Sequence, residues 1–132
     1  MTATLTDDGL GFVTEYHLAS LTTLRADGRP HVTPVGFTYD PDLHEAFVIC
    51  DGGSQKAVNV RRAGAVALCQ VDRGRWLTIE GTAVVSDDPT AVADAVARYT
   101  VRYRPPRVNP NRVVVRITPT AILGSPSLVD RS

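Results

Sequence analysis

Two glycines, a serine and a lysine stand together in residues 51–62, DGGSQKAVNVRR. Gly52 and Gly53 mark a turn, and Ser54 is a residue type preferred at the N-cap of a helix. The free backbone N–H groups at a helix start, together with the positive charge of Lys56, can hold an anion such as a phosphate. The same residues are also typical of an ordinary capped turn with an exposed lysine, which is the commoner arrangement. The spacing excludes a Walker A loop, whose lysine directly follows a glycine and precedes serine or threonine.

A second unusual stretch is residues 31–39, HVTPVGFTY, which carries Pro34 and Gly36 in the middle of an expected strand. Proline forfeits a ladder hydrogen bond there, and glycine offers no side chain to pack. Two interpretations stay open. A flat ligand can lie against the exposed main chain, because glycine permits a close approach. Equally, the segment can be an edge strand that its proline protects from aggregation.

The histidines and cysteines do not form a pattern that predicts a metal site. His17, His31 and His44 lack the pairing or the cysteine company of a zinc site, so we expect no metal. Cys50 and Cys69 stand apart, without a C-x-x-C motif, inside apolar runs. They are typical of small buried side chains in a reducing compartment.

The length and charge of the chain limit its possible partners. Its 132 residues, 43% of them hydrophobic, predict one domain over residues 1–132. Acidic and basic residues balance at 14 each, so nucleic acid and anionic membranes are not expected partners and any anion site must be local. Lys56 is the only lysine among the basic residues. Without a signal-peptide layout or a run of about 20 apolar residues, the chain is expected to be cytoplasmic.

The elements that must position these residues follow from the alternation of apolar runs and turns. The predicted strands are residues 18–24, 31–39, 45–50, 65–71, 76–86 and 112–118. The continuous apolar character of residues 65–71 suggests burial on both faces. Six strands in hairpin order, with helices only at intervals, favour a mainly β fold, a small antiparallel barrel, over a parallel doubly wound sheet.

Helix starts are predicted at two further places. Thr6 precedes two aspartates that suit the positive end of a helix dipole. Asp88 and Pro89 provide a cap and a first helical residue. Apolar and aromatic residues then recur at intervals of four, three and four, which places them on one side of that helix, toward the sheet. They are Val92, Val96, Tyr99 and Tyr103.

Four segments together resemble a known family: LASLTTLRADGRPHVTPVGF, GGSQKAVNVRR, QVDRGRWLTIEGTA and NRVVVRITPTAILG. The chain is similar to the flavin and deazaflavin oxidoreductases of the split β-barrel fold, which are related to pyridoxamine 5'-phosphate oxidase. Within that family it looks most like the actinobacterial branch that uses coenzyme F420, and especially like its small mycobacterial biliverdin reductases. The resemblance implies a six-stranded split barrel and a homodimer with two cofactor sites between subunits.

The resemblance also implies which positions bind the cofactor. Pro34, Val35 and Gly36 would lie against the deazaflavin ring. A second set, Ser54, Gln55, Lys56 and Asn59, would hold the phosphate and ribityl chain. Trp76 and Arg112 would lie nearby, from the same or the partner subunit. Some relatives carry arginine at the position of Ser54, so this chain has one fixed charge fewer there.

The implied reaction is hydride transfer from reduced coenzyme F420 to biliverdin or a similar conjugated acceptor, with no catalytic side chain assigned. Arginines can hold the two propionates of such an acceptor, although surface charges are the commoner role for arginine. The candidates are Arg25, Arg29, Arg61 and Arg75. Two alternatives remain, because a fold does not determine a function. One is an FMN-binding oxidase or reductase, and the other is a non-catalytic carrier of deazaflavin or a tetrapyrrole.

Overall fold

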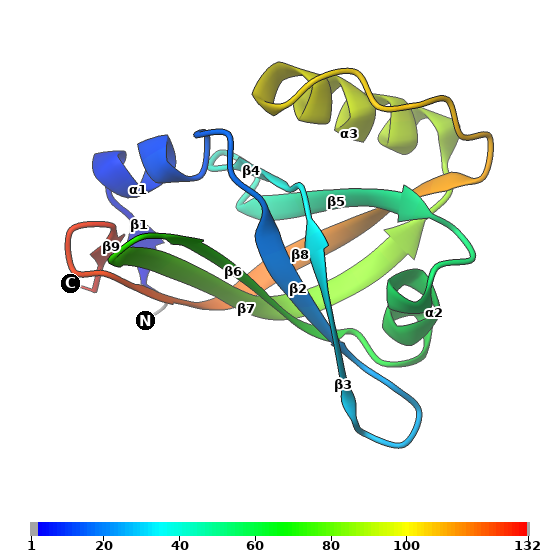
Figure 1. Ribbon diagram of the computed structural model, residues 1–132, viewed down its shortest axis with the longest axis horizontal. Helices are drawn as coiled ribbons and strands as arrows, with labels where there is room; N and C mark the ends of the chain where they lie inside the picture. The colour runs from blue at the N-terminus through cyan, green and yellow to red at the C-terminus, as the bar shows by residue number, and fades with distance from the viewer. Residues whose placement is uncertain (1–2, 132) are drawn as a thin grey trace.

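The computed structural model describes residues 3–131, in which a curled antiparallel sheet is accompanied by three helices (Figure 1). Seven strands form the sheet in the order β3-β2-β6-β7-β8-β5-β4, and β1 pairs separately with β9. In chain order the elements are β1 Thr4–Leu5, α1 Asp7–Phe12, β2 Ala19–Leu24, β3 Pro30–Val35, β4 Thr38–Asp40, β5 Glu45–Asp51, α2 Gln55–Arg62, β6 Ala65–Asp72, β7 Arg75–Ser86, α3 Pro89–Arg102, β8 Arg112–Gly124 and β9 Val129–Asp130.

The two edge strands of the sheet, β3 and β4, are neighbours in the chain. Only Gly36 and Phe37 separate them, so the sheet must curl until its opposite edges nearly meet. A register shift between Glu80 and Gly81 in the long β7–β8 pair marks a bulge, and bulges increase local bending. The result is a split barrel, and the predicted mainly β, antiparallel barrel class is confirmed.

The predicted strand over residues 31–39 is two strands, which raises the sheet from six strands to seven. The break falls at Gly36 and Phe37, two residues after Pro34, which pairs with Ser20 at the edge of the sheet. The interpretation of this segment as an edge strand is therefore confirmed. It does not exclude a ligand on the same main chain, because an edge strand leaves one side of its backbone unpaired.

The C-terminal end of α3 closes the gap between the two edges. The hydroxyl of Tyr103 accepts from the backbone N–H of Phe37 at 3.2 Å, and Arg102 Nη1 donates to the Phe37 carbonyl at 2.6 Å. Phe37 leaves the sheet, so its backbone groups need partners elsewhere. The helix end supplies them, and the split in the barrel is held in one geometry.

The predicted helix starts are confirmed. Thr6 Oγ1 accepts from the backbone N–H of Gly9 at 3.0 Å, and Asp88 accepts from Ala91 at 3.0 Å with proline directly after it. Val92, Val96 and Tyr99 of α3, and Tyr103 directly after it, are half-buried, while Ala95 is the most buried residue of this helix. It packs on Phe47 of the sheet.

The main core fills the inside of the curled sheet. The strand of residues 65–71 contributes alternate residues to it, with Val66 and Leu68 buried and Val71 of the other face 57% exposed. The predicted burial of both faces is therefore wrong, because only the inner face of β6 meets the core. Within residues 3–131, no helix is long and apolar enough to span a membrane.

Candidate functional site

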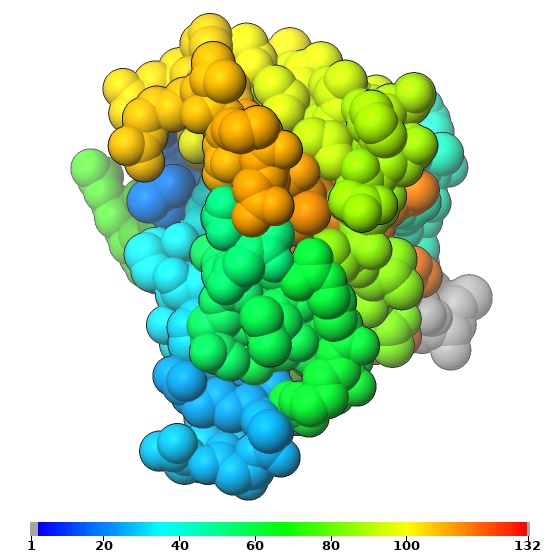
Figure 2. Space-filling view, turned by 90° about the vertical axis from the view of Figure 1, so that its right-hand side faces the viewer, coloured from blue at the N-terminus to red at the C-terminus, as the bar shows by residue number. Residues whose placement is uncertain are grey.

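An open groove of about 650 Å³ lies between β3, the turn before α2 and the loop that follows α3. Figure 2 faces this part of the molecule, with the orange loop above the green α2 region and the cyan β3 at its side. Six of the nine predicted cofactor-binding residues line the groove. They are Pro34, Val35, Gly36, Ser54, Lys56 and Arg112.

Gly36 is the point where α3 meets the groove. A Cβ atom on this residue would lie 2.7 Å from Cε2 of Tyr99 and 3.0 Å from Cε2 of Tyr103. The two tyrosine rings therefore already require glycine here, whatever binds in the groove. Tyr99 also lines the groove, so a flat ligand beside Pro34 would meet this ring as well as main chain.

Ser54 stands at the N-cap of α2, but its side chain does not cap the helix. The hydroxyl instead donates to the carbonyl of Asp51 at 2.7 Å. The predicted side-chain cap is thus wrong, because the preceding turn competes for the same hydroxyl. The first-turn N–H groups of α2 keep no side-chain acceptor from Ser54, which suits the binding of an anion beside Lys56.

Asp51 ties the turn before α2 to the loop after α3. Its carboxylate accepts from the backbone N–H of Gly53 at 2.8 Å and from the side-chain amides of Asn109 and Asn111 at 3.2 Å each. The bond from Gly53 first, and then the two amides, hold the pKa of this carboxyl below its usual range. The carboxyl group of Asp51 is therefore ionised at neutral pH, and its oxygens already accept hydrogen bonds from within the chain.

The groove concentrates positive charge in a chain whose net charge is zero. Lys56, Arg104, Arg107 and Arg112 line it, against the single acidic residue Asp51. Within residues 3–131, none of these four cations forms an ion pair with a carboxylate. A local field of this sign favours an anionic ligand.

Gln55 and Asn59 lie away from the groove lining. Gln55 Nε2 donates to Asn59 Oδ1 at 2.6 Å, and Asn59 Nδ2 donates to Thr23 Oγ1 at 3.0 Å. Asn59 is 1% exposed, so its amide fastens α2 to β2 inside the protein. In this chain the two side chains support the helix that presents Lys56.

Trp76 is remote from the groove of its own chain. Its backbone N–H donates to Ser125 Oγ at 3.1 Å, and its carbonyl accepts from the backbone N–H of Ser125 at 3.0 Å. This places it at the end of the sheet near β1 and β9, whereas α2 lies at the opposite end (Figure 1). Trp76 is 42% exposed.

Sequence reasoning missed Arg104, Arg107 and Tyr99 as groove residues. A usable signal was present, because two prolines between two arginines indicate a stiff loop that displays both charges. The four arginines predicted for the propionates do not line the groove: Arg25, Arg29, Arg61 and Arg75. Cys50 does line it, but burial raises the pKa of its thiol, so the thiol stays protonated and is a weak nucleophile.

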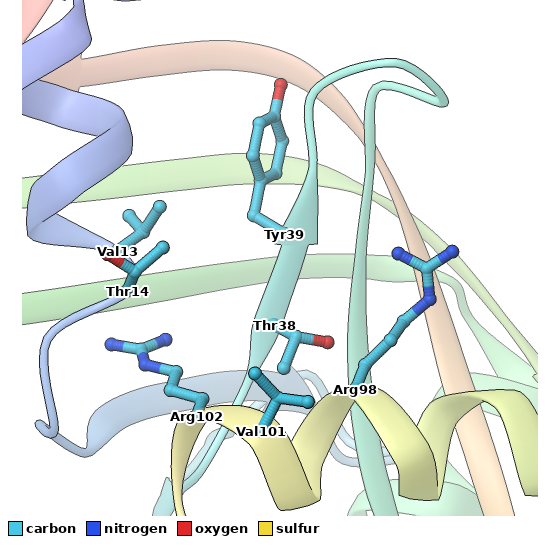
Figure 3. Close-up of a pocket in the computed structure, with 7 residues that line it drawn as sticks. All are labelled: Val13, Thr14, Thr38, Tyr39, Arg98, Val101 and Arg102. Carbon is cyan, nitrogen blue, oxygen red and sulfur yellow. The ribbon is translucent and has the colours of Figure 1, made fainter.

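A second, smaller pocket of about 300 Å³ lies on another side of α3 (Figure 3). None of the predicted cofactor residues lines it. Arg98 at its rim pairs with Asp40 at 2.7 Å and with Asp94 at 2.8 Å. Its positive charge is therefore already matched, and Arg102, the other cation of the lining, already donates to the Phe37 carbonyl and to Gln70. The larger groove is the better anion site.

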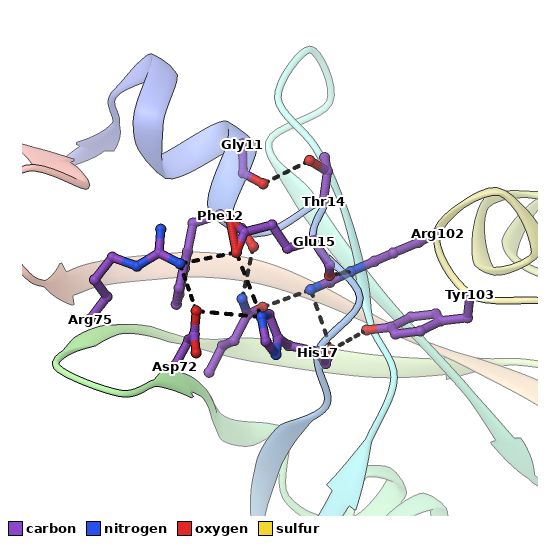
Figure 4. Close-up of polar contacts among 10 residues, drawn as sticks. Gly11, Phe12, Thr14, Glu15, His17, Asp72, Arg75, Arg102 and Tyr103 are labelled. Carbon is purple, nitrogen blue, oxygen red and sulfur yellow. Dashed lines mark hydrogen bonds and ion pairs between the residues drawn. The ribbon is translucent and has the colours of Figure 1, made fainter.

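Glu15, His17 and Asp72 bring three potential metal-ligand atoms within 4.8 Å of one another (Figure 4). Arg75 Nη2 lies 3.1 Å from Glu15 Oε1 and 2.7 Å from Asp72 Oδ2, so one guanidinium already forms an ion pair with each carboxylate. Beside them, Arg102 donates to the Glu15 carbonyl at 2.9 Å. This cluster joins the loop after α1 to β6 and to α3, which is a structural task.

Comparison with known proteins agrees with this architecture. Residues 5–125 match the family model described as pyridoxamine 5'-phosphate oxidase. The chain belongs to this family. Among curated members, it is 56% identical over 131 residues to a biliverdin reductase of Mycobacterium tuberculosis (strain CDC 1551 / Oshkosh) that depends on reduced coenzyme F420. The match covers 99% of this chain and 96% of the relative.

Solved structures of similar shape include two proteins at 25% identity. A conserved hypothetical protein from Mycobacterium tuberculosis has a TM-score of 0.79, covering 92% of this chain and 84% of that one. A protein titled F420 reductase has a TM-score of 0.72, covering 86% and 94%. The HupZ protein of Group A Streptococcus, at 19% identity and a TM-score of 0.77, shares the fold, covering 98% and 100%. The resemblance drawn from the sequence to this oxidoreductase family is confirmed.

Proposed function

We propose that this family member is a cytoplasmic reductase, built as one split-barrel domain, that transfers a hydride from reduced coenzyme F420 to biliverdin or a similar conjugated acceptor. The observation that carries the proposal is the groove itself. Main chain of the edge strand at Pro34 and Val35 opens onto the same space as Lys56 at the start of α2. The 56% identical relative, named for this reaction, supports the choice of coenzyme and acceptor.

The groove offers a separate place for each part of such a cofactor. Pro34, Val35 and the ring of Tyr99 give a surface for a flat ring system. Lys56 and the first-turn N–H groups of α2 suit a phosphodiester, with Arg112 as a further cation. Two free cysteines are compatible with a reducing compartment.

The bound cofactor would supply the hydride, so the chain has to bind, orient and exclude water. Donor and acceptor need a near-attack separation of roughly 3 to 3.5 Å between the reacting atoms. The rigid junction of α3 with Gly36 and Phe37 suits that task, because it holds one wall of the groove in place. No covalent nucleophile is required, in keeping with the protonated Cys50 thiol.

We also propose that the protein acts as a homodimer with the cofactor between subunits. The outer face of β6 carries small or apolar residues, with Val71 57% exposed, whereas that of β7 combines Trp76 and Val84, the latter 64% exposed, with threonines and Glu80. A water-exposed sheet face normally carries polar residues. Trp76 lies on this face, which supports its prediction as a group that reaches the groove of the partner subunit.

Anaerobic titration with reduced coenzyme F420 and with FMN tests the cofactor. We expect saturable binding of the deazaflavin, and its reoxidation only when biliverdin is added. FMN that copurifies and reacts with oxygen would instead indicate an FMN oxidase. Tight binding without turnover on a panel of conjugated acceptors would indicate a carrier.

Light scattering after gel filtration tests the dimer. The wild-type protein should have twice the mass of one chain, and Val84→Glu should release monomers, because it introduces an unpaired charge into an apolar interface. Val108→Glu is the matched control, since Val108 is 97% exposed on the loop after α3. A monomeric wild-type protein would contradict the proposal.

A further inference from the structure

The loop between α3 and β8 is a stiff segment with its own anchors. Pro105 and Pro106 fix two backbone torsions. Asn109 then bonds to Asp51, and the backbone N–H of Gly52 donates to the Asn111 carbonyl at 2.8 Å. The loop is thus held on both sides, by α3 before it and by the turn of Asp51 after it.

The side chains of Arg104 and Arg107 are exposed on this fixed backbone and line the groove. In the described part of the chain, neither guanidinium has a hydrogen bond or an ion pair. The nearby Asp51 cannot neutralise them in full, because it carries one negative charge against two guanidinium groups, and its oxygens accept hydrogen bonds from other residues. Two arginines are therefore displayed over a ligand groove without partners.

We propose that Arg104 and Arg107 form a carboxylate-binding subsite that selects an acceptor with acidic side arms. The proposal rests on the proposed function and goes beyond it by assigning the acceptor class to named residues. Guanidinium groups bind carboxylates through two parallel N–H bonds, which gives orientation as well as affinity. The two prolines, which also line the groove, add apolar surface beside the arginines. An acceptor with a conjugated apolar body and two propionates, as in biliverdin, matches this combination.

Carboxylates in this subsite could come from the acceptor or from the glutamate tail of coenzyme F420. The subsite is assigned to the acceptor because Lys56, the α2 start and Arg112 already provide cations for the cofactor tail. The two sources differ in a measurable way. Loss of an acceptor subsite affects the diacid acceptor only, whereas loss of a tail subsite affects cofactor affinity.

The test compares biliverdin with its dimethyl ester, which keeps the conjugated body and lacks both carboxylates. Variants are Arg104→Gln, Arg107→Gln and the double substitution, with Arg131→Gln as an exposed control of equal charge change. The measurements are kcat/KM for both acceptors, the dissociation constant of reduced coenzyme F420, and acceptor binding without cofactor. Wild-type protein should prefer the diacid. Each groove variant should lose about tenfold in kcat/KM for the diacid, mainly through KM, because a charge-assisted hydrogen bond contributes on that scale.

The outcomes separate the possibilities. The ester should react equally well with wild-type and double-variant protein, and the control should match wild type. Equal losses for diacid and ester would overturn the proposal, as would a loss confined to cofactor affinity. If wild-type protein does not reduce biliverdin, the proposed function fails. The cofactor-free binding of diacid against ester then still decides whether the two arginines hold carboxylates.

Discussion

Four arginines lie close together in the chain on two sides of the end of α3, and they are used in opposite ways. Arg98 pairs with Asp40 and Asp94, and Arg102 donates to the carbonyls of Phe37 and Glu15 and to a glutamine side chain. The side chains of Arg104 and Arg107, shortly beyond the helix, have no hydrogen-bond or ion-pair partner among the described residues. Arginines whose donors are matched within the chain stabilise the fold, whereas unmatched ones over a groove are available to a ligand.

At the junction, Arg102 and Tyr103 are half-buried. Burial lowers the pKa of Arg102 and raises that of Tyr103, because both charged forms lose contact with water there. Arg102 compensates through several carbonyl acceptors and by lying 4.6 Å above the Phe37 ring. Because the donors of Arg102 already have acceptors within the chain, this cation is not available to bind a ligand. Variants of the two regions should therefore separate stability from binding.

The largest effect is expected for Arg102→Ala. Its removal leaves the Gln70 side-chain oxygen without a donor and the Phe37 carbonyl with only the long 3.4 Å bond from the Tyr103 hydroxyl, and each unsatisfied buried group costs about 1 to 3 kcal/mol. We expect the free energy of unfolding to fall by roughly 4 kcal/mol in urea denaturation. Arg104→Ala is the matched control and should change it by less than about 0.5 kcal/mol. Equal losses in the two variants would contradict the division of roles.

A slightly smaller loss is expected for Gly36→Val, at the border between the regions. The new side chain would collide with the rings of Tyr99 and Tyr103, and overpacking costs about 1 to 3 kcal/mol. Thermal unfolding would measure the loss of stability.

The partner of this clash can be identified with a double variant. Gly36→Ala combined with Tyr99→Ala should be less destabilised than the sum of the two single variants, because the smaller residue 99 makes room for the Cβ atom. Strict additivity would show that Tyr99 is not what requires glycine at position 36.

Much of the fold was predictable because helix caps and turns are determined by residues that lie close together in the sequence. Thr6 and Asp88 cap their helices as expected, and the hairpin of β2 and β3 turns at Gly28 with its positive φ of 85°. The break at Gly36 and Phe37 was not predicted. It depends on α3, some 65 residues later, whose Arg102 and Tyr103 supply the hydrogen bonds that let the chain leave the sheet there.

The sequence predicted the site residues correctly where their place in the groove follows from the local backbone, that is, from a turn or an edge strand. Lys56 and Pro34 come together because a turn and an edge strand both face the groove. Ser54 and Asn59 behave differently from expectation, because their hydroxyl and amide bond to Asp51 and Thr23. Such choices between competing partners depend on tertiary structure and leave no local signal in the sequence.

Lys56→Ala should affect binding alone. The ammonium group has no ion-pair partner among residues 3–131, so its loss should not change urea denaturation measurably. The affinity for reduced coenzyme F420 should fall by about 2 kcal/mol, the scale of a charge-assisted hydrogen bond. Fluorescence titration gives the dissociation constant. Arg131→Gln serves as the control for loss of a positive charge. A similar loss of affinity in this variant would mean that Lys56 acts only through the net charge of the protein and does not contact the cofactor.

The smallest effect concerns the acid that links the groove to the rest of the fold. Hydrogen bonds, first from Gly53, hold the pKa of Asp51 below its usual value of 3.8. A group with a lowered pKa in the folded state contributes its stability fully above that value and loses it as the pH falls through the folded pKa. Wild-type protein should therefore be more stable than Asp51→Asn at pH 7, and the difference should begin to shrink as the pH falls below about 4. The comparison by urea denaturation cancels the other carboxylates, which titrate alike in both proteins. A difference that persists unchanged at pH 3 would mean that the geometry of the side chain at position 51 anchors the loop, and that its charge does not.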